Sequence, residues 1–218
     1  EMARLDALAQ EHGIPLIIDN AYGMPFPNII YSDVTLNWHE NIILCFSLSK
    51  VGLPGVRTSI IVAAPEVVKA VSSLNAIVNL SPTRFGAAIA TPLLQDGRLK
   101  QLSDDVIRPF YRNQAQTAVS LLKRELGAYP LKIHKPEGAI FLWLWFENLP
   151  VSSQTLYEML KAEGTLIIPC EHFFVGIDTQ DYPHACECIR MSIAQDAETL
   201  EKGIAAIGRV VRGLYDAA

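Results

Sequence analysis

The sequence has few of the features that mark membrane proteins, disulfide-rich secreted proteins or nucleic-acid-binding proteins. None of its hydrophobic runs reaches the ~20 residues that a membrane-spanning helix needs. It has no excess of positive charge, since its formal net charge of -5 argues against electrostatic binding to nucleic acid. Only 4 cysteines occur in 218 residues, at positions 45, 170, 186 and 188, and a chain of this length needs no disulfide staples. This cysteine usage predicts reduced thiols and a cytoplasmic setting.

The composition that remains is that of a globular protein with a large core. Hydrophobic residues make up 50% of the 218 residues, and this length allows one or two domains. Near the start, Met2, Leu5 and Leu8 have helical spacing that stops at Gly13, and an apolar strand follows at once. A helix that leads into a buried strand implies earlier strands for it to pair with. We therefore expect the sequence to be the C-terminal portion of a longer protein.

Apolar runs and turn signals predict the other elements. Strands are expected at residues 16–18, 41–46, 59–63, 139–146, 165–169 and 187–193. Helices are expected at residues 65–76, 99–126, 152–163 and 197–214. Pro109 lies within the second of these helices and predicts a kink or a boundary there, because proline lacks the N–H that an interior helical position uses.

Residues 47–57 are the most informative segment, because they place one lysine among hydroxyls in a glycine-rich loop. The segment contains Ser47, Ser49 and Lys50, and Arg57 follows the lysine by seven residues. Two hydroxyls and a guanidinium can hold a phosphate while the lysine amine bonds to a carbonyl carbon. The pattern predicts a site for a phosphorylated aldehyde. Ser47 and Lys50 also fit the Ser-x-x-Lys of serine acylases, but the companion motifs Ser-Asp-Asn and Lys-Thr-Gly occur nowhere in the chain.

A second motif ends the apolar run of residues 15–18 in a carboxylate. Asp19 is followed three residues later by the phenol of Tyr22. A carboxylate in this place can hold a pyridine nitrogen in its protonated form. An aspartate after an apolar strand also caps helices or binds magnesium in many α/β proteins. The order of strand, Asp19, Tyr22, second strand, Lys50 and Arg57 favours the pyridine interpretation.

These motifs resemble a known family. Asp-x-x-Tyr, followed by Ser-x-Ser-Lys and an arginine, is similar to the pattern of the pyridoxal-phosphate aminotransferases of fold type I, class I/II. The strand His-Lys-Pro-Glu-Gly-Ala-Ile-Phe-Leu-Trp-Leu-Trp-Phe at residues 134–146 most resembles the valine–pyruvate aminotransferases of that family, as do Phe173, Phe174 and Arg190. The resemblance covers essentially the whole chain. The plainer interpretation of this strand is that alternate residues such as Leu142 and Leu144 only form core.

The resemblance implies a fold and an activity. The fold class is α/β: the C-terminal part of a pyridoxal-phosphate-binding large domain, with a mixed, mostly parallel sheet, at residues 1–110, and then a smaller α+β domain at 111–218. The activity is transamination between valine or alanine and the 2-oxo acids pyruvate and 2-oxoisovalerate, in a homodimer that serves amino-acid biosynthesis. The family's phosphate-binding loop, ring-stacking aromatic residue and asparagine near the ring oxygen do not occur in this sequence. We therefore expect little activity from this chain alone.

The resemblance also assigns a role to each motif residue. Lys50 bonds to the aldehyde of pyridoxal 5'-phosphate and then transfers a proton. Asp19 keeps the ring nitrogen protonated, and Tyr22 donates a hydrogen bond to the ring oxygen. The phosphate binds two hydroxyls and a guanidinium, which are those of Ser47, Ser49 and Arg57.

Arg190 is the expected site of the substrate's α-carboxylate. It lies in an apolar strand pattern, where a charged residue is unusual. A planar guanidinium can donate two parallel hydrogen bonds to one carboxylate. The alternative is a structural salt bridge.

Other functions share parts of this pattern. Lyases, decarboxylases and cyclopropane-forming enzymes of the same fold use the same lysine and aspartate, and some transcription regulators carry this fold as an effector domain. Four possible metal ligands also fall close together in the sequence, namely His172, His184, Cys186 and Cys188. Cys-x-Cys is a poor match to the usual zinc spacing, so we expect no metal. Nor do we expect a nucleic-acid or membrane partner.

Overall fold

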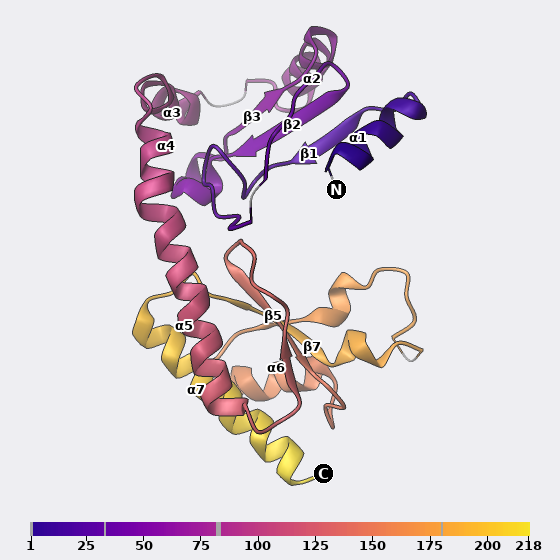
Figure 1. Ribbon diagram of the computed structural model, residues 1–218, viewed down its shortest axis with the longest axis vertical. Coiled ribbons are helices and arrows are strands. Elements are labelled where there is room, and N and C mark those ends of the chain that lie inside the picture. The colour runs from indigo at the N-terminus through magenta and orange to yellow at the C-terminus, as the bar shows by residue number, and fades with distance from the viewer. Residues whose placement is uncertain (1, 33, 82–83, 180) are drawn as a thin grey trace. The chain divides into compact units, whose positions relative to one another are not determined.

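The computed structural model describes residues 2–32, 34–81, 84–179 and 181–218. The chain divides into two compact units, Glu1–Pro109 and Phe110–Ala218. The division falls inside helix α5 (Arg108–Leu126), next to the expected domain boundary after residue 110 (Figure 1). The identification of these units with the large and small domains of a pyridoxal-phosphate enzyme stays a prediction.

The first unit contains a mixed sheet. Its strands β1 (Leu16–Asp19), β2 (Ile42–Ser47) and β3 (Ser59–Val62) lie in the order β1-β2-β3. The β1 and β2 strands are parallel, with Asp19 opposite Cys45. The β3 strand runs antiparallel to β2, with Ser59 opposite Ser47. Because parallel strands end at the same edge and β3 begins there, the residues that follow β1 and β2 gather with those that precede β3.

Buried and partly buried residues alternate along β2, and the buried ones form part of the core of this unit. Ile42, Leu44 and Phe46 are buried, and the residues between them are only partly buried. The helices here are α1 (Met2–Glu11), α2 (Pro65–Val78), α3 (Phe85–Gln95) and α4 (Arg98–Leu102). Just after α1 the chain turns at Gly13, whose φ of 62° is the left-handed conformation that glycine adopts readily. The α2 helix is mostly apolar, and none of its residues is buried.

The expected long helix is interrupted where the sequence predicted a kink or boundary. A π-helical turn, Ser103–Ile107, separates α4 from α5, and the N–H of Arg108 bonds to the carbonyl of Ser103. Pro109 is the second residue of α5. A proline cannot donate to the preceding turn, and a widened turn directly before it removes the need for that bond.

The second unit contains an antiparallel sheet. Its strands β4 (Leu131–Ile133), β5 (Phe141–Phe146), β6 (Ile168–Pro169) and β7 (Cys188–Ser192) lie in the order β4-β5-β7-β6. The sequence predicted three of these strands. It did not predict β4, because three residues are too few to show an alternating pattern. It predicted β6 at residues 165–169, of which only the last two pair with β7.

One face of this sheet packs on helices. The helices α5, α6 (Ser153–Ala162) and α7 (Ala197–Asp216) lie against the sheet (Figure 1). Their buried residues join those of β5 and β7 in one core. Leu142 and Leu144 are 1% and 0% exposed, so their prediction as core residues is confirmed. The helices α6 and α7 begin at N-cap residues whose side chains accept N–H bonds from the first turn. None of the described helices is long and apolar enough to cross a membrane.

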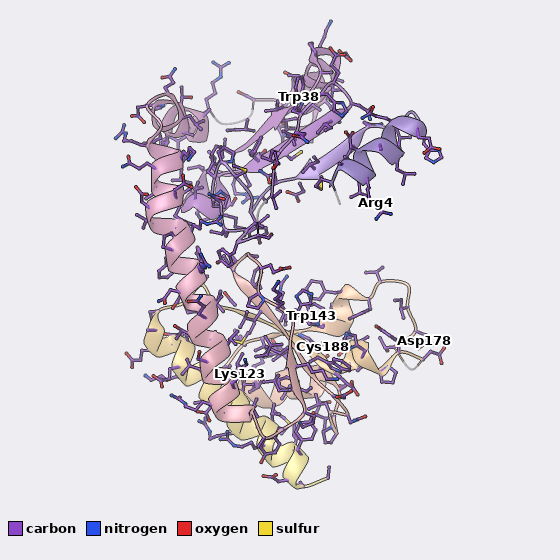
Figure 2. All side chains as sticks on the ribbon, in the orientation of Figure 1. Arg4, Trp38, Lys123, Trp143, Asp178 and Cys188 are labelled. Atoms are coloured by element: carbon purple, nitrogen blue, oxygen red, sulfur yellow. The ribbon has the colours of Figure 1, made fainter. Side chains whose placement is uncertain are left out.

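The other face of the sheet carries aromatic residues and one arginine. Trp143 of β5 lies opposite Arg190 of β7, and Trp145 lies opposite Cys188. Trp143 and Cys188 are both labelled in Figure 2. The segment between β6 and β7 contains the 3₁₀ turns Cys170–Phe173 and Pro183–Cys186 and contacts this face. Its Phe173 ring centroid lies 5.6 Å from that of Trp143.

Candidate active site

Lys50 and Tyr22 meet at the edge where β1 and β2 end. Lys50 lies in the 3₁₀ turn Ser49–Val51 that follows β2, and Tyr22 lies in the loop that follows β1. The Lys50 Nζ atom is 5.6 Å from the centroid of the Tyr22 ring. Among the residues that the structure describes, Lys50 has no hydrogen bond and no ion pair. Its amine is therefore available to a ligand.

A buried asparagine shapes the loop that holds Tyr22. Asn20 is 6% exposed, its backbone N–H donates to the Cys45 carbonyl at 2.8 Å, and its Nδ2 donates to the Met24 carbonyl at 2.6 Å. The N–H of Ile29 donates to the Tyr22 carbonyl at 2.9 Å. Asn20 was not among the residues that the sequence motifs indicated. It stands next to Asp19 in the motif, but nothing in the sequence showed that its side chain is buried.

Asp19 ends β1 with an exposed carboxylate. Its Oδ1 accepts the N–H of Ala21 at 3.2 Å. On the neighbouring strand, burial and the negative charge of Asp19 raise the pKa of the Cys45 thiol. Asp19 also lines a hollow of about 650 Å³ that α1, β1 and the segment before β2 enclose. Asp19 thus places an anionic charge on the same sheet edge as Lys50.

The expected phosphate-binding residues form a compact loop. Ser47 Oγ accepts the N–H of Ser49 at 3.2 Å, and Arg57 Nη1 donates to Ser49 Oγ and to the Pro54 carbonyl, each at 3.4 Å. Two 3₁₀ turns bring Arg57 back to Ser49. A guanidinium beside one hydroxyl, with a second hydroxyl in the same loop, fits a phosphate. Together with the amine, phenol and carboxylate at this edge, these groups match the chemistry of pyridoxal phosphate.

The serine-acylase interpretation does not fit this geometry. In an acylase the lysine amine would have to reach the serine hydroxyl that it activates. Here the Ser47 hydroxyl accepts a backbone N–H, and the Lys50 amine lies over the Tyr22 ring.

Arg190 lies on the aromatic face of the second unit without a polar partner. Its Nε is buried and unbonded, and the guanidinium makes no hydrogen bond or ion pair with any residue in the described part of the chain. Its Cζ atom lies 4.2 Å from the ring centroid of Phe141 and 4.9 Å from that of Phe173. Among the described residues, Arg190 therefore has no acidic partner for a structural salt bridge. The contacts of these two rings with Arg190 were not predicted, because spacing along the chain does not reveal them.

The possible metal ligands do not form a cluster. The two ring nitrogens of His184 lie 3.6 and 3.8 Å from Cys188 Sγ. Within the described ranges no third residue joins them in a group that could hold a metal ion. Burial raises the pKa of Cys188 to about 11 and that of Cys170 to about 12, so both thiols stay protonated at neutral pH.

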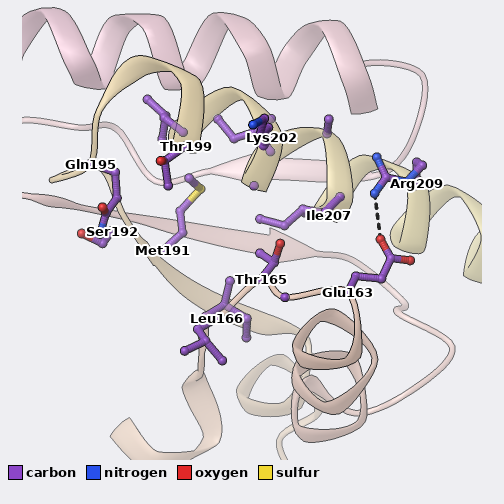
Figure 3. A pocket seen from close by; sticks show the side chains of 17 residues that line it. Glu163, Thr165, Leu166, Met191, Ser192, Gln195, Thr199, Lys202, Ile207 and Arg209 are labelled. Atoms are coloured by element: carbon purple, nitrogen blue, oxygen red, sulfur yellow. Dashed lines mark hydrogen bonds and ion pairs between the residues drawn. The ribbon is translucent and has the colours of Figure 1, made fainter.

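A hollow in the second unit contains none of the expected site residues. It measures about 630 Å³ and lies between α7, β7 and the segment before β6 (Figure 3). Two of its charged side chains bond to each other, with Arg209 Nη2 2.8 Å from Glu163 Oε2. Lys202 pairs with Glu198 at 2.5 Å. The three charged side chains that line this hollow therefore already have charged partners.

Comparison with known proteins identifies the family. Residues 1–207 match the family described as aminotransferase class I and II. The chain is 46% identical over 204 residues to the valine–pyruvate aminotransferase of Escherichia coli (strain K12), an alignment that covers 94% of this chain and 49% of that protein.

Two solved structures share the fold. A putative amino-acid aminotransferase from Psychrobacter arcticum 273-4 has a TM-score of 0.96 and 68% identity, over 100% of this chain and 50% of that one. The valine–pyruvate aminotransferase of Salmonella typhimurium LT2 has a TM-score of 0.92 and 42% identity, over 100% of this chain and 56% of that one.

These comparisons confirm the predicted α/β fold type and the predicted resemblance to valine–pyruvate aminotransferases. The chain spans about half the length of the curated relatives it matches. Members of the matching family depend on pyridoxal phosphate, which agrees with the predicted cofactor. The match extends over residues 1–207, almost the whole sequence. The chain therefore belongs to the class I and II aminotransferases.

Proposed function

We propose that the whole protein is a pyridoxal-phosphate-dependent aminotransferase in which this chain supplies the lysine, the ring-nitrogen partner and the carboxylate-binding arginine. The observation that carries the proposal is the unpartnered amine of Lys50 over the Tyr22 ring, at the sheet edge where Asp19 also lies. In this proposal Glu1–Pro109 belongs to the cofactor-binding large domain and Phe110–Ala218 to the small domain.

Each side chain has a distinct task in this reaction. When bound, pyridoxal phosphate supplies an aldehyde that bonds to amines and a ring that accepts electrons from the substrate's Cα. Lys50 Nζ would hold the cofactor and, once freed, would take the proton from the substrate's Cα as general base and deliver it to the cofactor's aldehyde-derived carbon as general acid. Asp19 keeps the pyridine nitrogen protonated. Tyr22 donates a hydrogen bond to the ring oxygen.

The remaining residues position the two ligands. Arg57 and the hydroxyls of Ser47 and Ser49 would hold the phosphate, which anchors the cofactor through charge-assisted hydrogen bonds. Arg190 would hold the α-carboxylate that every amino acid and 2-oxo acid of the cycle shares. No acidic residue in the described part of the chain pairs with it, which supports this role, because a paired guanidinium would have to give up its partner first.

Covalent trapping tests the role of Lys50. Borohydride reduction of the loaded whole enzyme, followed by peptide mapping, should place the cofactor on Lys50. Lys50→Ala should lose the visible absorbance of the lysine-bound cofactor and all transamination. Lys69→Ala is the matched control, since Lys69 lies on α2 far along the chain from this loop, and it should keep both. A label on Lys69 or Lys135 would show that the assignment is wrong.

We propose valine and alanine as amino donors and pyruvate and 2-oxoisovalerate as acceptors, in a cytoplasmic homodimer of amino-acid biosynthesis. Support comes from the valine–pyruvate aminotransferases among the relatives and from the aromatic residues near Arg190. An apolar pocket distinguishes one methylene by only ~1 to 3 kcal/mol, so activity should spread over alanine, valine and 2-aminobutyrate. A panel of donors tests this. Glutamate or aspartate outperforming valine by about tenfold or more would contradict the apolar preference and leave transamination intact.

A further inference from the structure

We propose that Phe141 and Phe173 are positioning residues that hold the Arg190 guanidinium ready for a carboxylate. This inference rests on the proposed role of Arg190 in substrate binding. The two rings replace the acidic partner that usually fixes a partly buried arginine.

The rings approach Arg190 from the two strands that flank it. Phe141 begins β5 and lies opposite Ser192, which places it diagonally next to Arg190 on the same face. On the other side, Ile168 of β6 pairs with Arg190, and the turn that follows β6 ends at Phe173. The distances of 4.2 and 4.9 Å from Cζ to the ring centroids lie within the range of cation–π contacts.

Aromatic partners suit a binding arginine better than a carboxylate would. A ring attracts the guanidinium through its face and leaves the N–H groups, which lie in the guanidinium plane, free to donate. A carboxylate would occupy these donors and compete with the substrate. No described acidic residue pairs with Arg190, so the rings can orient the cation without neutralising it.

A third aromatic residue supports this arrangement. Trp143 lies opposite Arg190 in the sheet, and its ring meets that of Phe173 edge-to-face at 5.6 Å. Phe173 is 46% exposed, so replacing its ring removes little buried core. Tyr182 belongs to the same aromatic group through contacts with Phe174 and His184, and it has no contact with Arg190 among those observed. Tyr182 is therefore the matched control.

The test uses the whole enzyme loaded with cofactor and a set of single variants. Phe173→Leu and Phe141→Leu should each raise KM about three- to tenfold for every donor and acceptor, while kcat changes less than about twofold. Binding of 3-methylbutanoate, a carboxylate without an amino group, should weaken by the same factor in calorimetry. Phe173→Tyr should keep both KM and the affinity for 3-methylbutanoate at the values of the unchanged enzyme, because tyrosine keeps the ring face. Tyr182→Leu should change neither.

The outcomes separate this inference from the proposed function. If Phe173→Leu and Phe141→Leu behave like Tyr182→Leu, or lower kcat at unchanged KM, the positioning role is wrong. If Arg190→Gln leaves the affinity for 3-methylbutanoate unchanged, the proposed carboxylate site itself is wrong. In the Arg190→Gln background Phe173→Leu should have no further effect, and an undiminished effect there would also overturn the inference. Thermal melting identifies any variant that fails to fold. If Phe141→Leu fails to fold, the variants of the exposed Phe173 still test the inference.

Discussion

A substitution of Asp19 tests whether its negative charge keeps the ring nitrogen of the cofactor protonated. Asp19→Asn keeps an acceptor for the Ala21 N–H and removes the negative charge. We expect turnover to fall about a hundred- to thousandfold, the range seen when one charge-stabilising group is lost, while cofactor binding through Lys50 persists. Steady-state kinetics at saturating cofactor, together with the absorbance of the bound cofactor, measure the two effects separately. Near-normal turnover would contradict the role.

The four thiols differ in burial and should differ in reactivity. Cys170 and Cys188 are 0% exposed, and burial raises their pKa values. The thiolate is the form that attacks, so these two should resist iodoacetamide until the protein unfolds. Cys186 and Cys45 are half-buried and should react in the folded protein, with Cys45 slowed by its raised pKa. Time-resolved peptide mass spectrometry gives the order in which the thiols react. Prompt labelling of Cys188 in the folded protein would contradict the predicted order.

The same pKa shifts predict loss of stability in alkali. Below the ordinary thiol pKa of 9.0, both the folded and the unfolded chain keep the Cys188 proton. Between 9.0 and about 11 the unfolded chain releases it and the folded chain does not, so the free energy of unfolding falls as pH rises. Cys188→Ala should reduce this slope. Urea unfolding on either side of pH 9.0 provides the comparison.

The loop after β1 depends on the absence of a side chain at Gly23. A Cβ atom there would lie 2.0 Å from Asn20 Oδ1, and Asn20 is buried. Gly23→Ala should therefore displace the asparagine, shift Tyr22 and lower the free energy of unfolding by about 1 to 3 kcal/mol. Gly213→Ala in α7 is the control, since nothing lies within 4 Å of its Cβ position. Helix propensity predicts a gain of up to about 1 kcal/mol there. Equal effects in the two variants would argue against the contact.

The sequence predicted elements best where a pattern was long. The apolar alternation of β5 and the helical spacing of α7 each extend over several residues, and both elements were predicted. β4 was missed and β6 was predicted too long, because pairing of two or three residues depends on neighbours that periodicity does not reveal. At the candidate site, the family resemblance assigned Lys50 and Tyr22 to one site, and the Lys50 amine lies 5.6 Å from the Tyr22 ring centroid. The contact of Phe173 with Arg190 depends on the turn after β6, and no spacing in the sequence indicates it.

At the scale of the whole chain, the first unit leaves the apolar helix α2 exposed. The α2 helix has no buried residue, and its Leu74 and Ile77 are 61% and 75% exposed. An exposed apolar helix face usually marks a place where another part of a protein binds. The relatives are about twice as long as this chain, so we expect its 218 residues to behave differently alone than within the whole protein.

Expressed alone, the 218-residue chain should bind a hydrophobic dye, self-associate and bind pyridoxal phosphate weakly. Any charge-assisted hydrogen bond that the chain alone cannot make to the cofactor would weaken binding by about 1.5 to 3 kcal/mol. Replacing both Leu74 and Ile77 by Gln should reduce dye fluorescence and association. Val175→Gln should not, although Val175 is 90% exposed, because it lies outside α2. Dye fluorescence and sedimentation measure these changes. A monodisperse chain that does not bind the dye would show that the exposed face of α2 does not need another part of a protein to cover it. Tight cofactor binding at full stoichiometry would show that the donors at this sheet edge are sufficient to bind the cofactor.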